Sequence, residues 1–296
     1  MDLANVQSGA TAFVMRLALL TSLTMIAFAA NSVLTRLAIE GQHIDPSGFA
    51  IVRVAAGALV LGMVITLRGG GLPLLRRNRL PGAFSLAAYM IGFSLAYLTL
   101  DAGLGALILF GVVQITMFAH GALSGAAPNM RQITGAAIAF AGLLLALWPG
   151  AGGNSDAVGA ALMVFAGLGW AAYTIIGRST ADPLAATAAN FLLCLPILLV
   201  LLVSAGLYFS PMGLALGILC GGLTSGLGYA LWYSVLPRLT SATAAVVQLS
   251  VPVIAIGAGA VFLDEAVGLM LVISTVLVLG GIGWAISAGS VPADRR

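Results

Sequence analysis

Charged residues are scarce in this chain of 296 residues, and lysine is missing altogether. Charged side chains make up 7% of the residues and hydrophobic ones 61%, whereas a soluble domain carries roughly 25% charged residues. So few charges could not cover a water-facing surface. The basic residues are all arginine, which excludes a P-loop and Schiff-base chemistry because both need a lysine.

Residues that usually carry catalysis or bind metals are also few. The two cysteines, Cys194 and Cys220, lie in apolar runs and are interpreted as buried small residues rather than a disulfide. An intramembrane enzyme would need a nucleophile with a base, or paired carboxylates. Neither His43 nor His120 is placed for such a role. We therefore expect no enzyme activity, no metal site and no cofactor.

Apolar runs of about 20 residues, the length that crosses a hydrocarbon core of ~30 Å, recur along the chain. They predict an all-α polytopic membrane protein with ten transmembrane helices. Pro196 and Pro252 fall deep inside predicted spans and indicate kinks. The spans are expected near residues 14–37, 47–68, 80–100, 102–122, 132–149, 157–178, 184–206, 211–236, 240–262 and 267–288.

The arginines favour one orientation, because cytoplasmic loops are enriched in basic residues. With both termini in the cytoplasm, the outer side keeps only Arg36 and the nearby intramembrane Arg53. An alternative, a cleaved signal peptide ending near Ala29, is disfavoured because the apolar run continues past that residue. The other arginines then lie on the inner side: Arg16, Arg68, Arg76, Arg77, Arg79, Arg131, Arg178, Arg238, Arg295 and Arg296.

Short segments recur in the same order in the two halves of the chain. Residues 29–36 (AANSVLTR) resemble residues 171–178 (AAYTIIGR), and residues 93–100 resemble residues 229–236. The chain is thus interpreted as two five-helix repeats, 14–149 and 157–288. Because five is odd, the second repeat must be inverted, and inverted repeats place a substrate site at their interface near the membrane midplane. This pattern indicates transport.

The layout resembles a known group of carriers. Five spans repeated once, arginines closing the first and sixth spans (Arg36 and Arg178), and the motif FLDEAVG at 262–268 resemble the EamA branch of the drug/metabolite transporter superfamily. Within it, the chain is similar to YddG-type aromatic amino acid exporters. The resemblance implies a multi-pass carrier of the bacterial inner (plasma) membrane, with spans 1, 3, 4, 6, 8 and 9 around a central cavity.

The first half departs from the family pattern. Gln114 stands where the counterpart of Pro252 would be, and Ala126 and Ala127 stand where an acidic residue is expected. The two halves are therefore not interchangeable.

Ionisable residues are nearly absent from the predicted spans, and this limits the chemistry. A proton-driven exporter of cations needs a carboxylate near the middle of a span, and none is present. We expect a neutral or zwitterionic substrate and no proton coupling. Arg53, about two turns into the second span, has two interpretations. It could hold a substrate carboxylate, or it could pair with Asp45 or Asp101 or extend to the membrane interface.

Aromatic and amide side chains near the midplane are the candidate substrate contacts. Aromatic rings would stack on an apolar side chain while amides and hydroxyls hold the polar end. The alternatives are an interfacial aromatic belt and hydrogen bonds between helices. The candidates are Trp170, Tyr89, Tyr173, Asn31, Phe93, Gln114, Gln248 and Tyr229.

The functional hypothesis is a membrane transporter that exports amino acids with large apolar or aromatic side chains by alternating access. The alternative is export of drugs, nucleobases or other amphipathic metabolites through the same cavity. The expected partners are the small-molecule substrate and the lipid bilayer. Nucleic acid is not expected, because the net charge of +3 lies on short loops. The sequence leaves the oligomeric state open, and a monomer is consistent with it.

Overall fold

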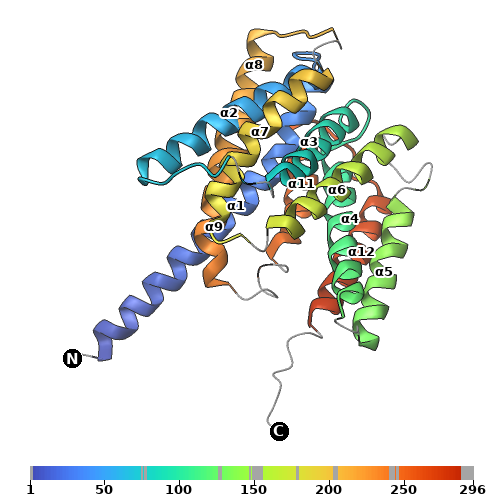
Figure 1. The fold of residues 1–296 in the computed structure, drawn as a ribbon. Coiled ribbons are helices and arrows are strands. Elements are labelled where there is room, and N and C mark those ends of the chain that lie inside the picture. The colour runs from blue at the N-terminus through green and yellow to red at the C-terminus, as the bar shows by residue number, and fades with distance from the viewer. Residues whose placement is uncertain are drawn as a thin grey trace.

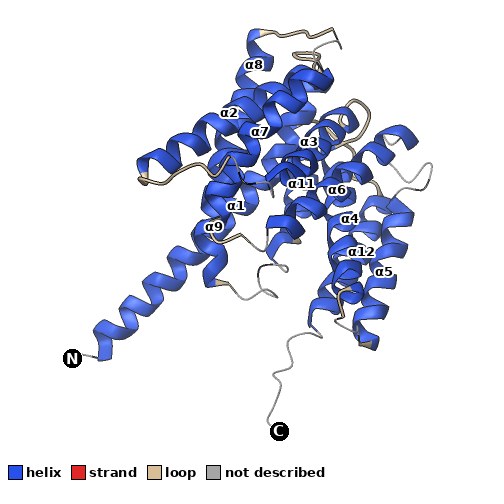
Figure 2. Cartoon of the chain, viewed as in Figure 1, coloured by secondary structure: helices blue, strands red, loops and turns tan. Residues whose placement is uncertain are grey.

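The computed structural model describes residues 3–74, 76, 79–125, 129–146, 148, 156–177, 180–202, 206–239, 244 and 247–287, with side chains from residue 12 onward. In this part of the chain the regular elements are helices (Figure 2), apart from an isolated bridge between Ile44 and Phe209. Several sequence-based expectations fall outside the described residues: those for Arg77, Ala126, Ala127, Arg178, Arg295 and Arg296, and the repeat boundaries at 149 and 288.

Each predicted span overlaps a helix. α8, the π-helix η2 and α9 follow one another without a break and are succeeded by a short 3-10 turn, η3. The bounds are α1 Leu3–Glu40, α2 Pro46–Leu67, α3 Arg79–Ala96, α4 Ala102–Leu123, α5 Met130–Ala146, α6 Ala157–Gly177, α7 Pro183–Leu202, α8 Pro211–Ile218, η2 Leu219–Leu227, α9 Gly228–Val235, η3 Leu236–Arg238, α11 Ser250–Phe262 and α12 Leu269–Ser287.

Seven helices within the described residues are long and apolar enough to cross a membrane, and α5 and α11 are shorter apolar helices. This is the composition of a polytopic helical membrane protein. The sequence predicts ten membrane crossings, and this number stays a prediction because seven of the described helices are long and apolar enough to cross a membrane.

Two helices begin at capping residues that the sequence supplies. The Oδ1 atom of Asp45 accepts a hydrogen bond from the Gly48 backbone N–H at 2.8 Å, and Pro46 opens α2. The hydroxyl of Ser210 accepts one from the Gly213 N–H at 3.0 Å, and Pro211 opens α8. A cap satisfies one free backbone donor, and proline at the first position loses no helical hydrogen bond.

The helices associate in pairs that are distant in sequence (Figure 1). α5 packs along α12, α3 along α6, and α2 along α7 and η2. α4 packs on α6 and α11, while α1 packs on α9, η2 and α11. The N-terminal part of α1 projects away from the other helices (Figure 1).

A row of glycines lets α8 and η2 approach α2 closely. A Cβ atom at Gly217 would lie 2.8 Å from the Val52 side chain, and one at Gly221 would collide with the backbone oxygen of Arg53. The close approach places the η2 side chains against the middle of α2.

Pro252 does not lie deep inside its helix as the sequence predicts. The helix is interrupted at Leu249, and α11 begins at Ser250, so Pro252 occupies the first turn of α11. Proline has no N–H to donate to the carbonyl four residues earlier, which belongs to Gln248. The interruption places Gln248 next to the cavity described below.

Candidate substrate cavity

A cavity of ≈ 30 Å³ lies where α1, α3, α4, α6 and α9 meet. More than half of its lining residues are aromatic, and the polar groups in the wall are hydroxyls, amides and the indole N–H of Trp170. Its lining residues are Phe28, Asn31, Ser32, Tyr89, Phe93, Leu109, Phe110, Trp170, Tyr229 and Gln248. Six of the eight sequence-predicted residues are among them: Asn31, Tyr89, Phe93, Trp170, Tyr229 and Gln248. The volume holds about two water molecules, so the walls must move apart to admit an amino acid.

Trp170 is the centre of the aromatic wall. Its ring stacks on Tyr229, with centroids 5.4 Å apart and an interplanar angle of 19°. Tyr89 contacts it at 5.0 Å in a tilted arrangement. Tyr89 and Phe93 also contact each other, at 5.2 Å. These rings come from α3, α6 and α9, so helices from both halves of the chain build one aromatic surface.

Tyr173 supports this surface from behind. Its ring stacks on Trp170 at 5.4 Å, and its hydroxyl donates a hydrogen bond to Thr187 Oγ1 at 3.0 Å. Thr187 in turn donates to the Tyr233 hydroxyl at 3.2 Å. Tyr173 is buried and fixes the position of Trp170 rather than lining the cavity itself.

Gln114 lies at a different place. It lines a separate cavity of ≈ 210 Å³ together with Gln132 on α5 and Ala285 near the end of α12. Gln114 is one helical turn beyond Phe110 on α4, about 6 Å along the axis, and this displacement takes it out of the aromatic cavity. Among the described residues, the wall of the wider cavity has no tyrosine or tryptophan, so the structure does not bring Gln114 to the other candidates.

Arg53 is completely buried directly beside the aromatic cavity. Its Nη2 atom donates to Asn31 Oδ1 at 3.1 Å and to the Tyr89 hydroxyl at 2.9 Å, and its Nε donates to the Ser225 hydroxyl at 3.1 Å. The guanidinium carbon also lies 4.9 Å from the centre of the Phe93 ring.

The structural pairings suggested for Arg53 by the sequence are wrong. Asp45 instead caps α2 and accepts a hydrogen bond from the Tyr208 N–H at 2.7 Å. Asp101 lies 3.7 Å from Arg36. Arg53 also does not extend to an interface, because no part of it is exposed. Its side chain turns inward toward α1, α3 and η2, where hydroxyl and amide groups surround it.

The polar face of η2 is the part of the site that sequence reasoning missed. The Oδ1 atom of Asn31 lies within reach of donors from Thr224 at 2.8 Å, Ser225 at 2.9 Å and Cys220 at 3.3 Å, besides Arg53. One amide oxygen has two lone pairs, so these donors compete. Three polar residues within six positions of an apolar span were the available signal.

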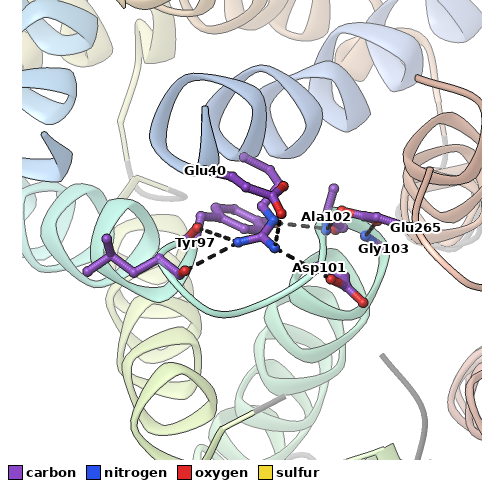
Figure 3. Close-up of polar contacts among 8 residues, drawn as sticks. Glu40, Tyr97, Asp101, Ala102, Gly103 and Glu265 are labelled. Carbon is purple, nitrogen blue, oxygen red and sulfur yellow. Dashed lines mark hydrogen bonds and ion pairs between the residues drawn. The ribbon is translucent and has the colours of Figure 1, made fainter. Parts of the chain in front are cut away.

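A second polar cluster ties helix ends together (Figure 3). Arg36 donates to the Tyr97 backbone oxygen at 3.0 Å and pairs with Glu40 at 2.9 Å. Glu265, from the segment between α11 and α12, accepts hydrogen bonds from the backbone N–H groups of Ala102 at 2.6 Å and Gly103 at 3.3 Å. It thereby caps α4. Partial burial raises the pKa of Glu265, although these two N–H groups act in the opposite direction.

Comparisons with known proteins agree with this architecture. Residues 157–287 match the family model described as the EamA-like transporter family. The chain is 45% identical over 275 residues to the uncharacterized protein PA1977 of Pseudomonas aeruginosa, covering 90% of this chain and 93% of that protein. A protein of known crystal structure is similar with a TM-score of 0.62 at 19% identity, covering 89% of this chain and 98% of that one.

At 19% identity the crystal structure shows a shared fold and nothing further. The family match adds that the chain is a multi-pass membrane transporter, since EamA family members are transporters rather than enzymes. The chain therefore carries, at residues 157–287, an EamA-like transporter domain of the drug/metabolite transporter superfamily.

Proposed function

We propose that the protein exports amino acids with large apolar or aromatic side chains across the bacterial inner membrane, by alternating access and without proton coupling. The observation that carries this proposal is the aromatic cavity built by Trp170, Tyr229, Tyr89 and Phe93 between helices of both halves. Flat rings offer an apolar side chain a stacking surface, and a few polar groups orient the other end of the molecule.

The pairing of the helices supports two inverted five-helix repeats. We match the two halves in chain order: α1 with α6, α2 with α7, α3 with the α8–η2–α9 element, α4 with α11 and α5 with α12. Three of these matched pairs, α2 with α7, α4 with α11 and α5 with α12, are packed together, so an exchange of the two halves preserves their contacts. The same exchange turns the contact of α3 with α6 into that of α9 with α1. It also turns the contact of α4 with α6 into that of α11 with α1. Two halves with equivalent contacts can exchange conformations, which is the basis of alternating access.

The distribution of carboxylates supports transport without proton coupling. Among the described residues, no acidic side chain lines the aromatic cavity. Glu40, Asp101 and Glu265 lie at helix ends or between helices. A carrier coupled to protons would need a group in the substrate pathway that alternates between binding a proton and binding substrate. The direction of transport, export, is taken from the family resemblance.

Export of drugs or nucleobases through the same cavity is the alternative function. Flat heteroaromatic rings would stack on Trp170 and Tyr229 as an aromatic side chain does, so the rings alone do not separate the two.

Competition against phenylalanine tests the proposal. Proteoliposomes that contain the purified protein are loaded with labelled phenylalanine, and its efflux is measured against excess unlabelled tryptophan, leucine, adenine or a cationic dye. The proposal expects tryptophan and leucine to compete and adenine and the dye to have no effect. Efflux that adenine or the dye blocks as well as tryptophan does would favour the alternative. Phenylalanine efflux no faster than that from loaded liposomes without the protein would overturn the amino acid assignment.

A further inference from the structure

The positive charge of Arg53 is buried without an acidic partner. Among the described residues, its hydrogen bonds go to the neutral side chains of Ser225, Asn31 and Tyr89, and no carboxylate forms an ion pair with it. A buried charge without a counter-charge is costly, so such groups are normally paired. An unpaired cation at the centre of the helices favours the binding of an anion there, because the anion would supply the missing counter-charge.

The guanidinium also has bonding capacity left. Its Nη1 atom is buried and has no hydrogen-bond partner within the described part of the chain. A guanidinium presents parallel N–H donors that fit the two oxygens of a carboxylate. Nη2 donates to two neutral acceptors and Nη1 donates to none of the described residues. Arg53 can therefore still donate hydrogen bonds to a carboxylate.

Arg53 lies one side chain away from the aromatic cavity. Both acceptors of its Nη2 atom, Asn31 and Tyr89, are in the cavity wall. Phe93, whose ring centre is 4.9 Å from the guanidinium carbon, is also in the wall. A small movement of the Tyr89 hydroxyl would expose the guanidinium to a molecule in the cavity.

We propose that Arg53 is the carboxylate-binding residue of the transporter, so that its substrates are monocarboxylates with an apolar or aromatic body. This inference rests on the proposed function and narrows its substrate class. Arg53 is the one cation beside the cavity within the described residues. One carboxylate neutralises it, whereas a doubly charged phosphate would leave a net negative charge in an apolar site. Carboxylate-free amines and nucleobases would leave Arg53 unpaired.

The location of Arg53 also links binding to the helices that must move. Its hydrogen bonds join α2 to α1, α3 and η2. A carboxylate that takes over donors of Arg53 releases Tyr89 or Asn31, so occupation of the site changes contacts among α1, α2 and α3, next to the Arg53–Ser225 hydrogen bond that joins α2 to η2 in the second half.

The first experiment uses the wild-type protein and two ligands of equal shape. Purified protein is incubated with 3-phenylpropanoate or with its uncharged amide, 3-phenylpropanamide, and binding is measured from the rise in melting temperature. The inference expects the acid to bind roughly 10- to 100-fold more tightly than the amide, the range for hydrogen bonds to a charged group. Equal binding of the two compounds, or of neither, would overturn it.

Two variants then locate the effect. Arg53→Gln removes the charge, and Asn31→Asp places a carboxylate beside Arg53 Nη2 that neutralises it from within the protein. Both variants are expected to lose the preference for the acid, whereas Arg53→Lys, which keeps the charge without the planar fork, retains part of it. A folded Asn31→Asp protein that still prefers the acid would contradict the role of Arg53.

The outcome separates this inference from the proposed function. If phenylalanine is not transported but 3-phenylpropanoate binds through Arg53, the amino acid assignment fails and the carboxylate site stands. If phenylalanine is transported and 3-phenylpropanamide inhibits that transport as well as the acid does, the carboxylate site fails and the amino acid assignment stands.

Discussion

Trp170 connects the sequence pattern to the proposed substrate site at the scale of single residues. It lies on α6, three residues before Tyr173, so both rings share one helix face. The structure adds what that spacing cannot show: Tyr89 and Tyr229, from α3 and α9, meet the same indole ring. The aromatic wall therefore depends on Trp170 more than on any one tyrosine.

Replacing Trp170 is expected to impair transport without unfolding the protein. Trp170→Ala removes the stacking surface and the apolar contact of the indole, together worth about 2 kcal/mol, so phenylalanine affinity is expected to fall at least about tenfold. The measurement is the initial rate of phenylalanine uptake into proteoliposomes at several concentrations.

Trp284→Ala is the matched control. Trp284 lies on α12, is 48% exposed and is covered by the Arg131 guanidinium at 4.4 Å, and it does not line the cavity. This variant should transport at the wild-type rate. Wild-type affinity in a well-folded Trp170→Ala protein would remove Trp170 from the site.

At the scale of elements, the π-helix η2 explains how polar side chains meet inside an apolar bundle. A π-helical hydrogen bond spans one residue more than an α-helical one, which changes the directions of Thr224 and Ser225 relative to the rest of the helix. Both face Asn31. Close contact with α2 depends on the absence of a side chain at Gly221.

Gly221→Ala is expected to destabilise the protein, because its Cβ atom would meet backbone atoms of Arg53 that cannot move aside. Overpacking of this kind costs roughly 1–3 kcal/mol. Gly222→Ala is the control, since its Cβ atom would face a Val60 methyl group at 3.3 Å that can shift. Melting temperatures of the two variants in detergent compare them. Equal values would contradict the close packing of η2 on α2.

The cap of α4 by Glu265 gives a dependence on pH. Because the pKa of Glu265 is raised in the folded protein, the folded state binds the proton more tightly than the unfolded state. Stability therefore falls as pH rises from the usual glutamate pKa, about 4.3, through the raised pKa. We expect Glu265→Gln to flatten this part of the curve of melting temperature against pH. An unchanged curve would show that Glu265 does not titrate in this window.

At the scale of the whole molecule, the helical architecture could be predicted from the sequence, because apolar runs and proline punctuation are local signals. Aromatic residues that share a helix face could be predicted for the same reason. The positions of Arg53 and Gln114 could not. Whether Arg53 points toward Asp101 or toward Asn31 depends on how α2 is rotated against its neighbours. Gln114 lies outside the site because it is one helical turn beyond Phe110 on α4.

The π-helix and the helix interruption before Pro252 also could not be predicted from the sequence. Both are departures from regular helix geometry that depend on packing against other helices. They affect the site because η2 supplies Ser225 to Arg53 and the interruption supplies Gln248 to the cavity.

Uptake of labelled phenylalanine into proteoliposomes, with and without an imposed pH gradient, tests the central claim of an uncoupled amino acid carrier most directly. We predict saturable uptake at the same initial rate in both conditions, because no carboxylate lines the cavity within the described residues. Uptake that requires the gradient would contradict transport without proton coupling. The absence of saturable uptake in both conditions would contradict the amino acid assignment.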